Sequence, residues 1–499
     1  MDKNHVLLLS ENSPLKGKDL APEIEVECWA HFEKTALATC DLVILDRVPS
    51  QQECRALDKI TRAHTLFYTP RVEPSRCKNL CASRAARPLP RASIQEFLEK
   101  DARWFFHESY GEKYIPENLA VADRFTGHVF WKGNCALQLS GDFGQEFTQV
   151  AFWRNDIPIE PGQTIDLWLE YQKTSGVQLR LQGVMFASGS LDTILNTVEF
   201  SEKELEQIVH ITAEKRSFLF LSVFAKGSGS LDIIALHDRY SRGPFGHFMP
   251  GGRRHVTSRR EEIFSYFDPG DGKPPLNVYF SGYKTREGFE AYHLMRKMGA
   301  PFLLISESRL EGGSFYVGED EYEQLMLSVL QEHLEQLGFS ADQMICSGIS
   351  MGSTGALYYG SMLMPHAIIV GKPLVNMGTI ALNERLVRPG GFPTSLDLLL
   401  KQEGQLGKAA AEKLNEHFWA QFRKADWSRT KLILSYMLED DYDKEAYSHM
   451  VEQLSASDAQ IYGRGLHGRH NDNSAGIVQW FFSQYQKTLN EDFGRTENK

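Results

Sequence analysis

The sequence predicts an α/β protein with an α/β-hydrolase-like, doubly wound domain at the C-terminus, preceded by a β-sandwich and an N-terminal α/β segment. From Leu276 onward, apolar strand-like runs alternate with helical patterns, which indicates a parallel sheet covered by helices on both faces. Between about 125 and 240, aromatic and β-branched residues alternate with polar ones between Gly-rich turns, the pattern of a sandwich. The expected parts are the N-terminal segment 1–120, the sandwich 121–245, a connector 246–275 and the catalytic domain 276–499.

The N-terminal segment carries three strand-like runs separated by more polar stretches, at Val6–Ser10, Leu42–Asp46 and Thr65–Tyr68. No G-x-G-x-x-G follows the first run, so a dinucleotide site has no support here. Residues 71–91 are rich in Arg, Pro, Ser and Cys, a composition typical of a solvated loop or linker.

Aromatic residues in the sandwich region either stack on sugar rings or fill the core, and the second role is the more common one. The candidates for stacking are Trp131, Trp153, Trp168 and Tyr171. The connector that follows is dense in Gly, Pro, Arg and aromatic residues, so we expect a packed joint between domains or a wall of the site.

The C-terminal domain contains six predicted strands, at Asn277–Phe280, Phe302–Ile305, Met344–Cys346, Ala367–Val370, Lys431–Tyr436 and Ala459–Tyr462. Helical patterns separate or follow them, at Glu287–Met298, Glu321–Leu337, Ala409–Arg423, Ala446–Leu454 and Gly476–Leu489. In such a sheet the functional loops follow the carboxyl ends of the strands.

Composition narrows the function classes. The 499 residues are 42% hydrophobic and 24% charged, as in soluble globular proteins. A net charge of −11 argues against nucleic-acid binding, which needs a basic face. The seven irregularly spaced cysteines indicate reduced thiols rather than a metal site. No apolar run approaches the roughly 20 residues of a spanning helix, so we expect a cytoplasmic protein that meets the inner membrane face only peripherally.

The strongest local signal is a nucleophile elbow around Ser350. An apolar run at Met344–Cys346 leads into Gly348-Ile349-Ser350-Met351-Gly352, and a helical pattern of small residues follows. A strand, G-x-S-x-G and a helix in this order hold a serine on a strained turn at the top of an α/β-hydrolase sheet. Glycine tolerates the backbone angles and the close approach that this turn requires.

An acyl-transfer serine also needs a base, an acid and backbone donors for the oxyanion. In α/β-hydrolases the triad follows the chain order Ser, Asp or Glu, His. The fifth strand is followed by four acids, Glu439, Asp440, Asp441 and Asp443, of which Asp440 and Asp441 are near equal candidates, and the sixth by candidate bases His467 and His470. Spacing alone decides neither choice.

One oxyanion donor is expected to be the backbone N–H of Met351, the residue after the nucleophile. The second should come from the loop after the first strand, where we favour the N–H of Gly282 or Tyr283. Two further loops are expected at the same edge and are candidates for the acceptor pocket. They are residues 308–313 and residues 371–373, the latter leading into 385–396.

Several long motifs resemble one family, the second accessory secretory protein of the accessory Sec system. They include F-S-G-Y (280–283), R-L-E-G-G-S-F-Y (309–316), S-G-I-S-M-G (347–352), I-I-V-G-K-P-L (368–374), R-P-G-G-F-P-T-S-L-D (388–397) and G-R-H-N-D-N (468–473). The similarity also reaches L-W-L-E-Y (167–171), A-L-H-D-R-Y-S-R (235–242) and F-D-P-G-D (267–271), and it is weak before about residue 120.

The resemblance implies an export component that O-acetylates N-acetylglucosamine on serine-rich-repeat adhesin glycoproteins and supports their secretion. It implies contacts with the accessory Sec motor ATPase and the other accessory Sec proteins, and a carbohydrate-binding-like sandwich. Matched motif by motif, the catalytic serine, acid and histidine fall on Ser350, Asp440 and His470. The acid is glutamate in some members, so Asp441 and Glu439 stay as alternates.

This interpretation implies no bound cofactor and no metal, but it requires an acetyl donor that the sequence does not identify. Two alternatives use the same residues differently. A serine esterase or deacetylase would pass the acyl group to water, since the acyl-enzyme is common to both reactions. A non-catalytic export scaffold would carry the hydrolase-like domain without using it, but an intact Ser, acid and His argue against a retired site.

Overall fold

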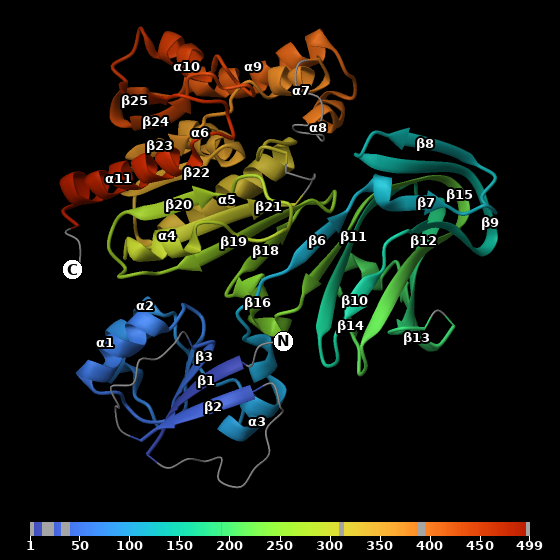
Figure 1. Cartoon of the computed structure of the whole chain (residues 1–499), viewed down its shortest axis with the longest axis horizontal. Coiled ribbons are helices and arrows are strands. Elements are labelled where there is room, and N and C mark those ends of the chain that lie inside the picture. Colours follow the sequence, from blue (N-terminus) through green and yellow to red (C-terminus); the bar gives the residue numbers. More distant parts are fainter. Residues whose placement is uncertain are drawn as a thin grey trace.

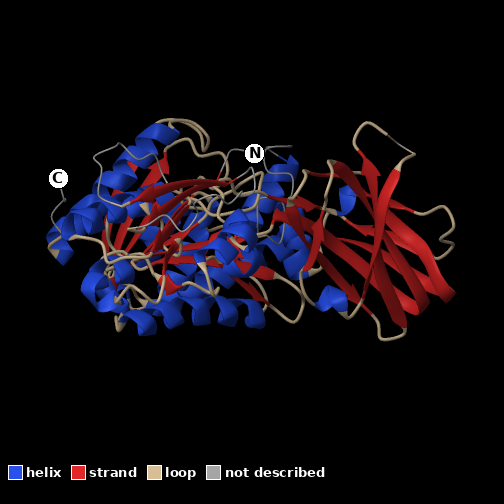
Figure 2. Ribbon diagram, turned by 90° about the horizontal axis from the view of Figure 1, so that it is seen from below, coloured by secondary structure: helices blue, strands red, loops and turns tan. Residues whose placement is uncertain are grey.

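Three sheets organise the chain in the computed structural model, which describes residues 4–11, 24–30, 40–190, 192–308, 314–386 and 395–495. In Figure 1 the N-terminal sheet lies at the lower left, a ten-stranded sheet at the right and an eight-stranded sheet with its helices at the upper left. Figure 2 shows the ten-stranded sheet as the strand-rich end of the molecule. Among the described residues, no helix is both long and apolar enough to cross a membrane.

The N-terminal sheet is parallel, with the order β2-β1-β3-β4-β5. Its strands are β1 (Asn4–Leu9), β2 (Ile24–Trp29), β3 (Leu42–Leu45), β4 (Leu66–Tyr68) and β5 (Arg87–Pro88). Its helices are α1 (Gln51–Ile60), α2 (Lys78–Ser83) and α3 (Ile94–Lys100), with short η1 (Pro74–Cys77) and η2 (Ala102–Trp104). The three predicted strands are present, but the expected loop 71–91 is wrong in part, since it contains η1, α2 and β5.

The middle of the chain forms ten antiparallel strands. They are β6 (Gly111–Tyr114), β7 (Leu119–Val121), β8 (His128–Lys132), β9 (Ala136–Trp153), β10 (Ile157–Ile159), β11 (Thr164–Lys173), β12 (Val177–Ala187), β13 (Ile194–Ser201), β14 (Val209–Thr212) and β15 (Ser217–Tyr240). The 24-residue β15 pairs with five of the other strands. Hydrogen bonds therefore join all ten strands in one network, and the predicted sandwich is not confirmed.

Irregular pairing explains how β15 and β9 stay continuous over such lengths. Their register shifts at Val223/Phe224 and on both sides of Gly227, and bulges of this kind let long strands bend. The strands bury a cluster of apolar side chains, and three of the four aromatic residues considered for stacking on sugars lie in buried positions. Trp153, Trp168 and Tyr171 are buried, whereas Trp131 on β8 is exposed.

The third sheet has the order β18-β19-β21-β20-β22-β23-β24-β25. Its strands are β18 (Arg253–Val256), β19 (Glu262–Asp268), β20 (Leu276–Phe280), β21 (Phe302–Glu307), β22 (Met344–Ile349), β23 (Ala367–Gly371), β24 (Lys431–Met437) and β25 (Gln460–Leu466). The six strands from β20 onward are parallel, as predicted, while β18 and β19 are antiparallel additions at one edge.

The segment 246–275 is therefore not only a connector. It supplies β18 and β19 to the sheet and a small hairpin, β16 (Gly246–His247) and β17 (Met249–Pro250). Every residue of β19 is buried, including Glu262 and Asp268. Charged residues at fully buried positions conceal a strand from hydrophobic patterning, because the pattern expects apolar residues there.

Helices cover both faces of the eight-stranded sheet. They are α4 (Tyr292–Lys297), α5 (Asp320–Leu337), α6 (Met351–Leu363), α7 (Met377–Leu386), α8 (Ser395–Glu403), α9 (Lys408–Lys424), α10 (Ala446–Leu454) and α11 (Ser474–Phe493). Val278 of β20 packs in one cluster with α5, α6 and α9, and its neighbour Tyr279 packs with α4 and α11 on the other face. The predicted helix 287–298 is shorter than expected, since 287–291 belongs to a loop.

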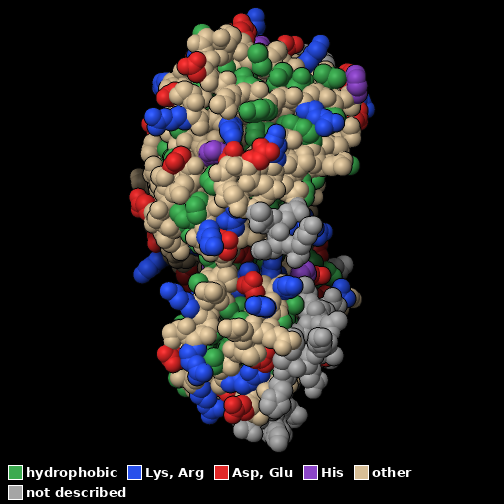
Figure 3. All heavy atoms as spheres, turned by 90° about the vertical axis from the view of Figure 1, so that its left-hand side faces the viewer, with side chains coloured by type: hydrophobic (Ala, Val, Ile, Leu, Met, Phe, Trp, Pro, Cys, Tyr) green, Lys and Arg blue, Asp and Glu red, His purple; other side chains and the backbone are tan. Residues whose placement is uncertain are grey.

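The remaining single turns are η3 (Pro116–Asn118), η4 (Glu204–Glu206), η5 (Gly243–Phe245), η6 (Ala341–Gln343) and η7 (Trp427–Arg429). On the face drawn in Figure 3, basic and acidic side chains are interspersed. All seven cysteines are free thiols.

Candidate active site

Ser350 lies on the sharp turn between β22 and α6. Its backbone angles are φ 57° and ψ −125°, a strained conformation for a residue with a β-carbon. Two glycines make the turn possible. A Cβ on Gly348 would lie 2.3 Å from the carbonyl oxygen of Gly352, and one on Gly352 would lie 2.1 Å from that of Phe280. The sequence motif therefore folds as a strand, a strained serine and a tightly packed helix.

The structure brings Ser350, His470 and Asp440 into one hydrogen-bonded chain. Ser350 Oγ lies 2.8 Å from His470 Nε2, and His470 Nδ1 lies 2.8 Å from Asp440 Oδ2. Asp440 follows β24 and His470 follows β25, so the three side chains meet at the carboxyl ends of parallel strands. His470 and Asp440 are buried, and Ser350 is partly exposed. This arrangement can deprotonate the serine hydroxyl.

Hydrogen bonds keep Asp440 ionised. Burial alone would raise its pKa, but the hydrogen bond from His470 and the backbone N–H groups of Tyr442 and Asp443 lower it below the ordinary value. The two N–H groups donate to Oδ1 at 2.8 and 3.1 Å. The ring of Tyr442 packs edge-on against His470, with centroids 4.4 Å apart. The imidazole is thus held by both its acid and its packing.

The alternate residues have other contacts. Asp441 Oδ1 accepts the backbone N–H of His470 at 3.0 Å, so this carboxylate contacts the main chain of the loop. Glu439 pairs with His467 at 3.1 Å and accepts the N–H of Gly468, in an exposed part of the same loop. Of the acids and histidines that spacing leaves open, the structure places Asp440 and His470 at the serine.

The oxyanion candidates lie beside the elbow, but one of them is engaged. Met351 is the first residue of α6, and the N–H groups of a first helical turn have no intrahelical acceptor. The N–H of Gly282 donates to Glu290 Oε2 at 2.8 Å. In this structure that N–H is therefore occupied by a carboxylate. Tyr283 is the other residue that the sequence predicts as a second donor.

A cavity of about 350 Å³ opens beside Met351 and Gly282. One wall comes from β6 and η3 of the ten-stranded sheet, including Lys113, Glu117 and Asn118, and the other from the loop after β20 and the end of β21. The lining is mostly polar, with charges of both signs. Sequence reasoning missed the first wall, because β6 reaches the site only by pairing with the end of β15.

The loops 308–313, 371–373 and 385–396 were also expected at the carboxyl edge of the sheet. Ser308 lines the cavity, while 309–313 and 387–394 lie outside the described residues. Lys372, after β23, donates from Nζ to Ser474 Oγ at 2.8 Å. Buried Asp443, the last of the four acids after β24, accepts the N–H groups of Val375 and Asn376 and so ties the acid loop to the loop after β23.

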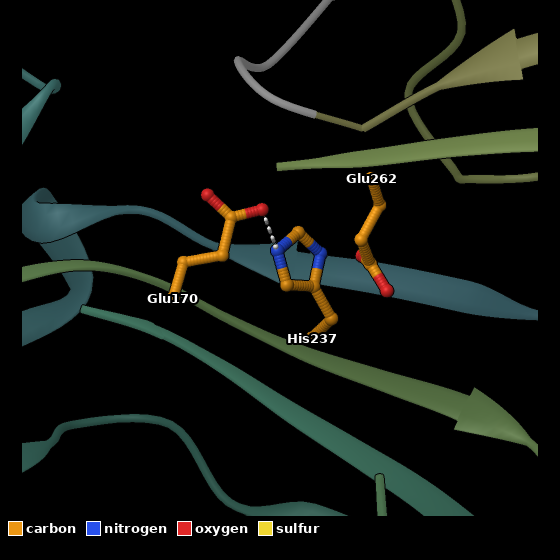
Figure 4. Close-up of side chains that lie close together, drawn as sticks. All are labelled: Glu170, His237 and Glu262. Atoms are coloured by element: carbon orange, nitrogen blue, oxygen red, sulfur yellow. Dashed lines mark hydrogen bonds and ion pairs between the residues drawn. The ribbon is translucent and has the colours of Figure 1, made fainter. Parts of the chain in front are cut away.

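A cluster with metal-ligand side chains lies away from the elbow, at the boundary of the two large sheets. Glu170, His237 and Glu262 have donor atoms within 4.8 Å of one another (Figure 4). Both ring nitrogens of His237 lie against carboxylates, and Glu262 is paired with Arg239 and Arg254. These contacts describe an ion-pair cluster, because a protonated imidazole offers no lone pair to a metal.

Comparison with known proteins identifies the family. The family model described as Asp2, accessory Sec system GspB-transporter, matches residues 34–495. The accessory Sec system protein Asp2 of Staphylococcus aureus is 42% identical over 413 residues, which cover 83% of this chain and 79% of that protein. Its namesake from Streptococcus gordonii is 40% identical over 438 residues, covering 87% and 85%.

A solved structure is similar over nearly the whole chain. It is the Glycosylation Associate Protein (Gap123) complex from Streptococcus agalactiae, one chain of which has a TM-score of 0.89 and 34% identity, covering 99% of this chain and 100% of that one. The chain described here therefore belongs to the Asp2 family of the accessory Sec system.

Proposed function

We propose that this chain is a serine-dependent O-acetyltransferase that acetylates N-acetylglucosamine on serine-rich-repeat glycoproteins before their export. The observation that carries the proposal is the hydrogen-bonded chain from Ser350 through His470 to Asp440. Family membership supports the setting in the accessory Sec system. The sugar acceptor rests on the resemblance of the motifs.

The first half-reaction forms the acetyl-enzyme. His470 Nε2 takes the proton of Ser350 as Oγ attacks the acetyl carbonyl of the donor, and Asp440 stabilises the imidazolium. The N–H of Met351 stabilises the negative charge that develops on the carbonyl oxygen. The bond to the leaving group then breaks, and His470 returns the proton to that group.

The second half-reaction transfers the acetyl group to the sugar. A sugar hydroxyl gives its proton to His470 and attacks the acetyl carbon, the ester bond to Ser350 breaks, and Oγ regains the proton. The 350 Å³ cavity beside Met351 is the proposed acceptor site. Its polar lining suits hydroxyl and amide groups, and its size suits a small part of a glycan rather than a folded glycoprotein.

A serine esterase or deacetylase remains the alternative within the same site, with water as the acceptor. A scaffold role is a separate proposal, supported by the similar chain that was solved in the Gap123 complex. We propose that this chain likewise assembles with other accessory Sec proteins and the motor ATPase. It would act in the cytoplasm, with peripheral contact at the inner membrane face.

The test compares secreted glycoprotein from strains carrying Ser350→Ala, His470→Ala or His467→Ala. Mass spectrometry of the released glycans should show loss of acetyl groups in the first two strains. His467→Ala is the matched control, because its side chain lies three positions away but is 89% exposed and pairs with Glu439. Unchanged acetylation in the Ser350→Ala strain would reject the transferase.

Export in the same strains separates the two roles. If Ser350→Ala secretes the glycoprotein normally while deletion of the whole gene does not, the scaffold role does not depend on catalysis. Purified protein mixed with an acetyl ester and N-acetylglucosamine distinguishes transferase from esterase, since only the transferase yields acetylated sugar.

A further inference from the structure

The loop between β20 and α4 carries both predicted second oxyanion donors and lines the cavity. We call residues 281–291 the oxyanion loop. Its internal hydrogen bonds include those from the N–H of Gly282 to Glu290, from the N–H of Glu290 to Ser281 Oγ, and from Lys284 Nζ to the carbonyl of Phe289. It has no helix or strand of its own. Its position must therefore depend on contacts with other parts of the chain.

The strongest of these contacts come from the ten-stranded sheet and converge on Glu287. Its backbone N–H donates to the carbonyl of Gly111 on β6 at 2.8 Å. Its Oε1 lies 2.7 Å from His237 Nδ1, and its Oε2 accepts from Arg239 Nε at 2.6 Å. His237 and Arg239 are alternate residues of β15, so they point to the same side of the strand.

The pairing is ionic and buried. Burial alone would raise the pKa of Glu287, but Arg239 and His237 lower it to about 2. Burial alone would lower the pKa of His237, but the charge of Glu287 and hydrogen bonds to Glu170 and Glu287 raise it to about 9. At neutral pH a carboxylate therefore faces a protonated imidazole and a guanidinium. Breaking such a pair leaves buried charges uncompensated.

His237 and Arg239 are themselves fixed by carboxylates on their other sides. His237 Nε2 lies 3.1 Å from Glu170 Oε1 on β11, as Figure 4 shows. Arg239 forms two hydrogen bonds with Glu262 on β19, and Arg254 reaches the same carboxylate. The cluster therefore carries three carboxylates and three cations, and it leaves little freedom for the groups that hold Glu287.

We propose that His237 and Arg239, through Glu287, are positioning residues for acyl transfer, and that the ten-stranded sheet thereby holds the oxyanion loop in its working position. The inference rests on the proposed function, because it assigns the loop to the oxyanion. None of the three touches the reacting atoms. Displacement of a catalytic group by about 1 Å is enough to cost roughly 100-fold in rate.

The two nitrogens of His237 allow a matched pair of variants. In His237→Asn the amide nitrogen takes the place of Nδ1 and can still donate to Glu287. In His237→Gln it takes the place of Nε2, so the variant keeps Glu170 and loses Glu287. We expect kcat for p-nitrophenyl acetate to fall about 100-fold in His237→Gln and less than tenfold in His237→Asn, with KM within about twofold of the wild type in both.

Arg260→Leu is the control for general loss of contact between the same two sheets. Arg260 lies on the β18–β19 turn and donates to the carbonyls of Leu169 and Leu205 in the ten-stranded region, without contacting the oxyanion loop. We expect a lower Tm but unchanged kcat. Equal losses of kcat in Arg260→Leu, His237→Asn and His237→Gln would mean that packing alone matters, and would overturn the proposal.

Hydrogen–deuterium exchange tests the same inference without any turnover. The amides of 282–288 should exchange faster in His237→Gln and Glu287→Gln than in the wild type, and remain protected in His237→Asn and Arg260→Leu. Unchanged protection in Glu287→Gln would refute the anchoring. If protection is lost as expected but Ser350→Ala turns over like the wild type, the anchoring stands and the proposed catalytic function is wrong.

Discussion

Replacing Asp440 with asparagine should abolish most of the activity while leaving the fold intact. Asp440 Oδ1 accepts two backbone N–H groups, from Tyr442 and Asp443, and Oδ2 faces His470 Nδ1. Asparagine has one oxygen, and the two N–H groups require it at Oδ1. Its NH₂ group must then face Nδ1 and donate to it. His470 is left with its proton on Nε2, where it cannot accept the proton of Ser350.

The wrong tautomer costs about 10⁴-fold in kcat, or about 5 kcal/mol of transition-state stabilisation. The assay is steady-state hydrolysis of p-nitrophenyl acetate, with thermal unfolding to verify folding. Asp441→Asn is the matched control. The Oδ1 atom of Asp441 accepts the backbone N–H of His470 and not its imidazole, so we expect a loss below about tenfold. An Asp440→Asn enzyme that retained a tenth of the wild-type kcat, or an Asp441→Asn enzyme equally impaired, would refute this assignment of the acid.

Three further predictions concern the elbow, the ion-pair cluster and metals. Gly352→Ala should lower the free energy of unfolding by about 1–3 kcal/mol or more and inactivate the enzyme, because the new Cβ would lie 2.1 Å from the carbonyl oxygen of Phe280. Calorimetry measures the loss of stability, and the ester assay measures the loss of activity. In the folded protein His237 faces Glu170, Glu287 and Arg239, and its pKa is raised to about 9. The stabilisation that its positive charge gives the folded protein is therefore complete below about pH 6.5 and is lost as the pH rises through 9. Denaturant unfolding should show a decrease of about 3 kcal/mol across that window, and a His237→Asn protein in which the same decrease persists would contradict the assignment. Treatment with EDTA should leave Tm unchanged, since the carboxylates of the cluster are already paired with cations; a fall in Tm would indicate a bound metal.

The sequence pattern was sufficient to predict the structure wherever residues close together in the chain determine it. The elbow is such a case, because the glycines two residues on either side of Ser350 leave room for the close packing that its strained turn requires. The parallel strands β20 to β24 were also predictable, since mostly buried strands consist of nearly continuous apolar runs, whereas β25 at the edge of the sheet is largely exposed. The strand β19 was missed because Glu262 and Asp268 stand at its two ends and Ser265 divides the apolar residues between them into two short pairs.

Spacing could not separate Asp440 from Asp441 or His470 from His467, since neighbours in one loop are equivalent in sequence terms. The motif resemblance chose one of each, and the structure places the chosen residues 2.8 Å apart. The hydrogen bond from the N–H of Gly282 to Glu290 could not be predicted from the sequence either. Its partner Glu290 is eight residues away in a loop whose path no local pattern describes.

By itself, the sequence determined the α/β class, the position of the nucleophile and the order in which acid and base follow it. Only the tertiary structure decided which acid meets which histidine, which sheet walls the cavity and what holds the oxyanion loop. The physical reason is the range of the interactions. Backbone strain and hydrophobic periodicity act between near neighbours, whereas the pairing of Glu287 with His237 joins residues 50 positions apart and exists only once the sheets have packed.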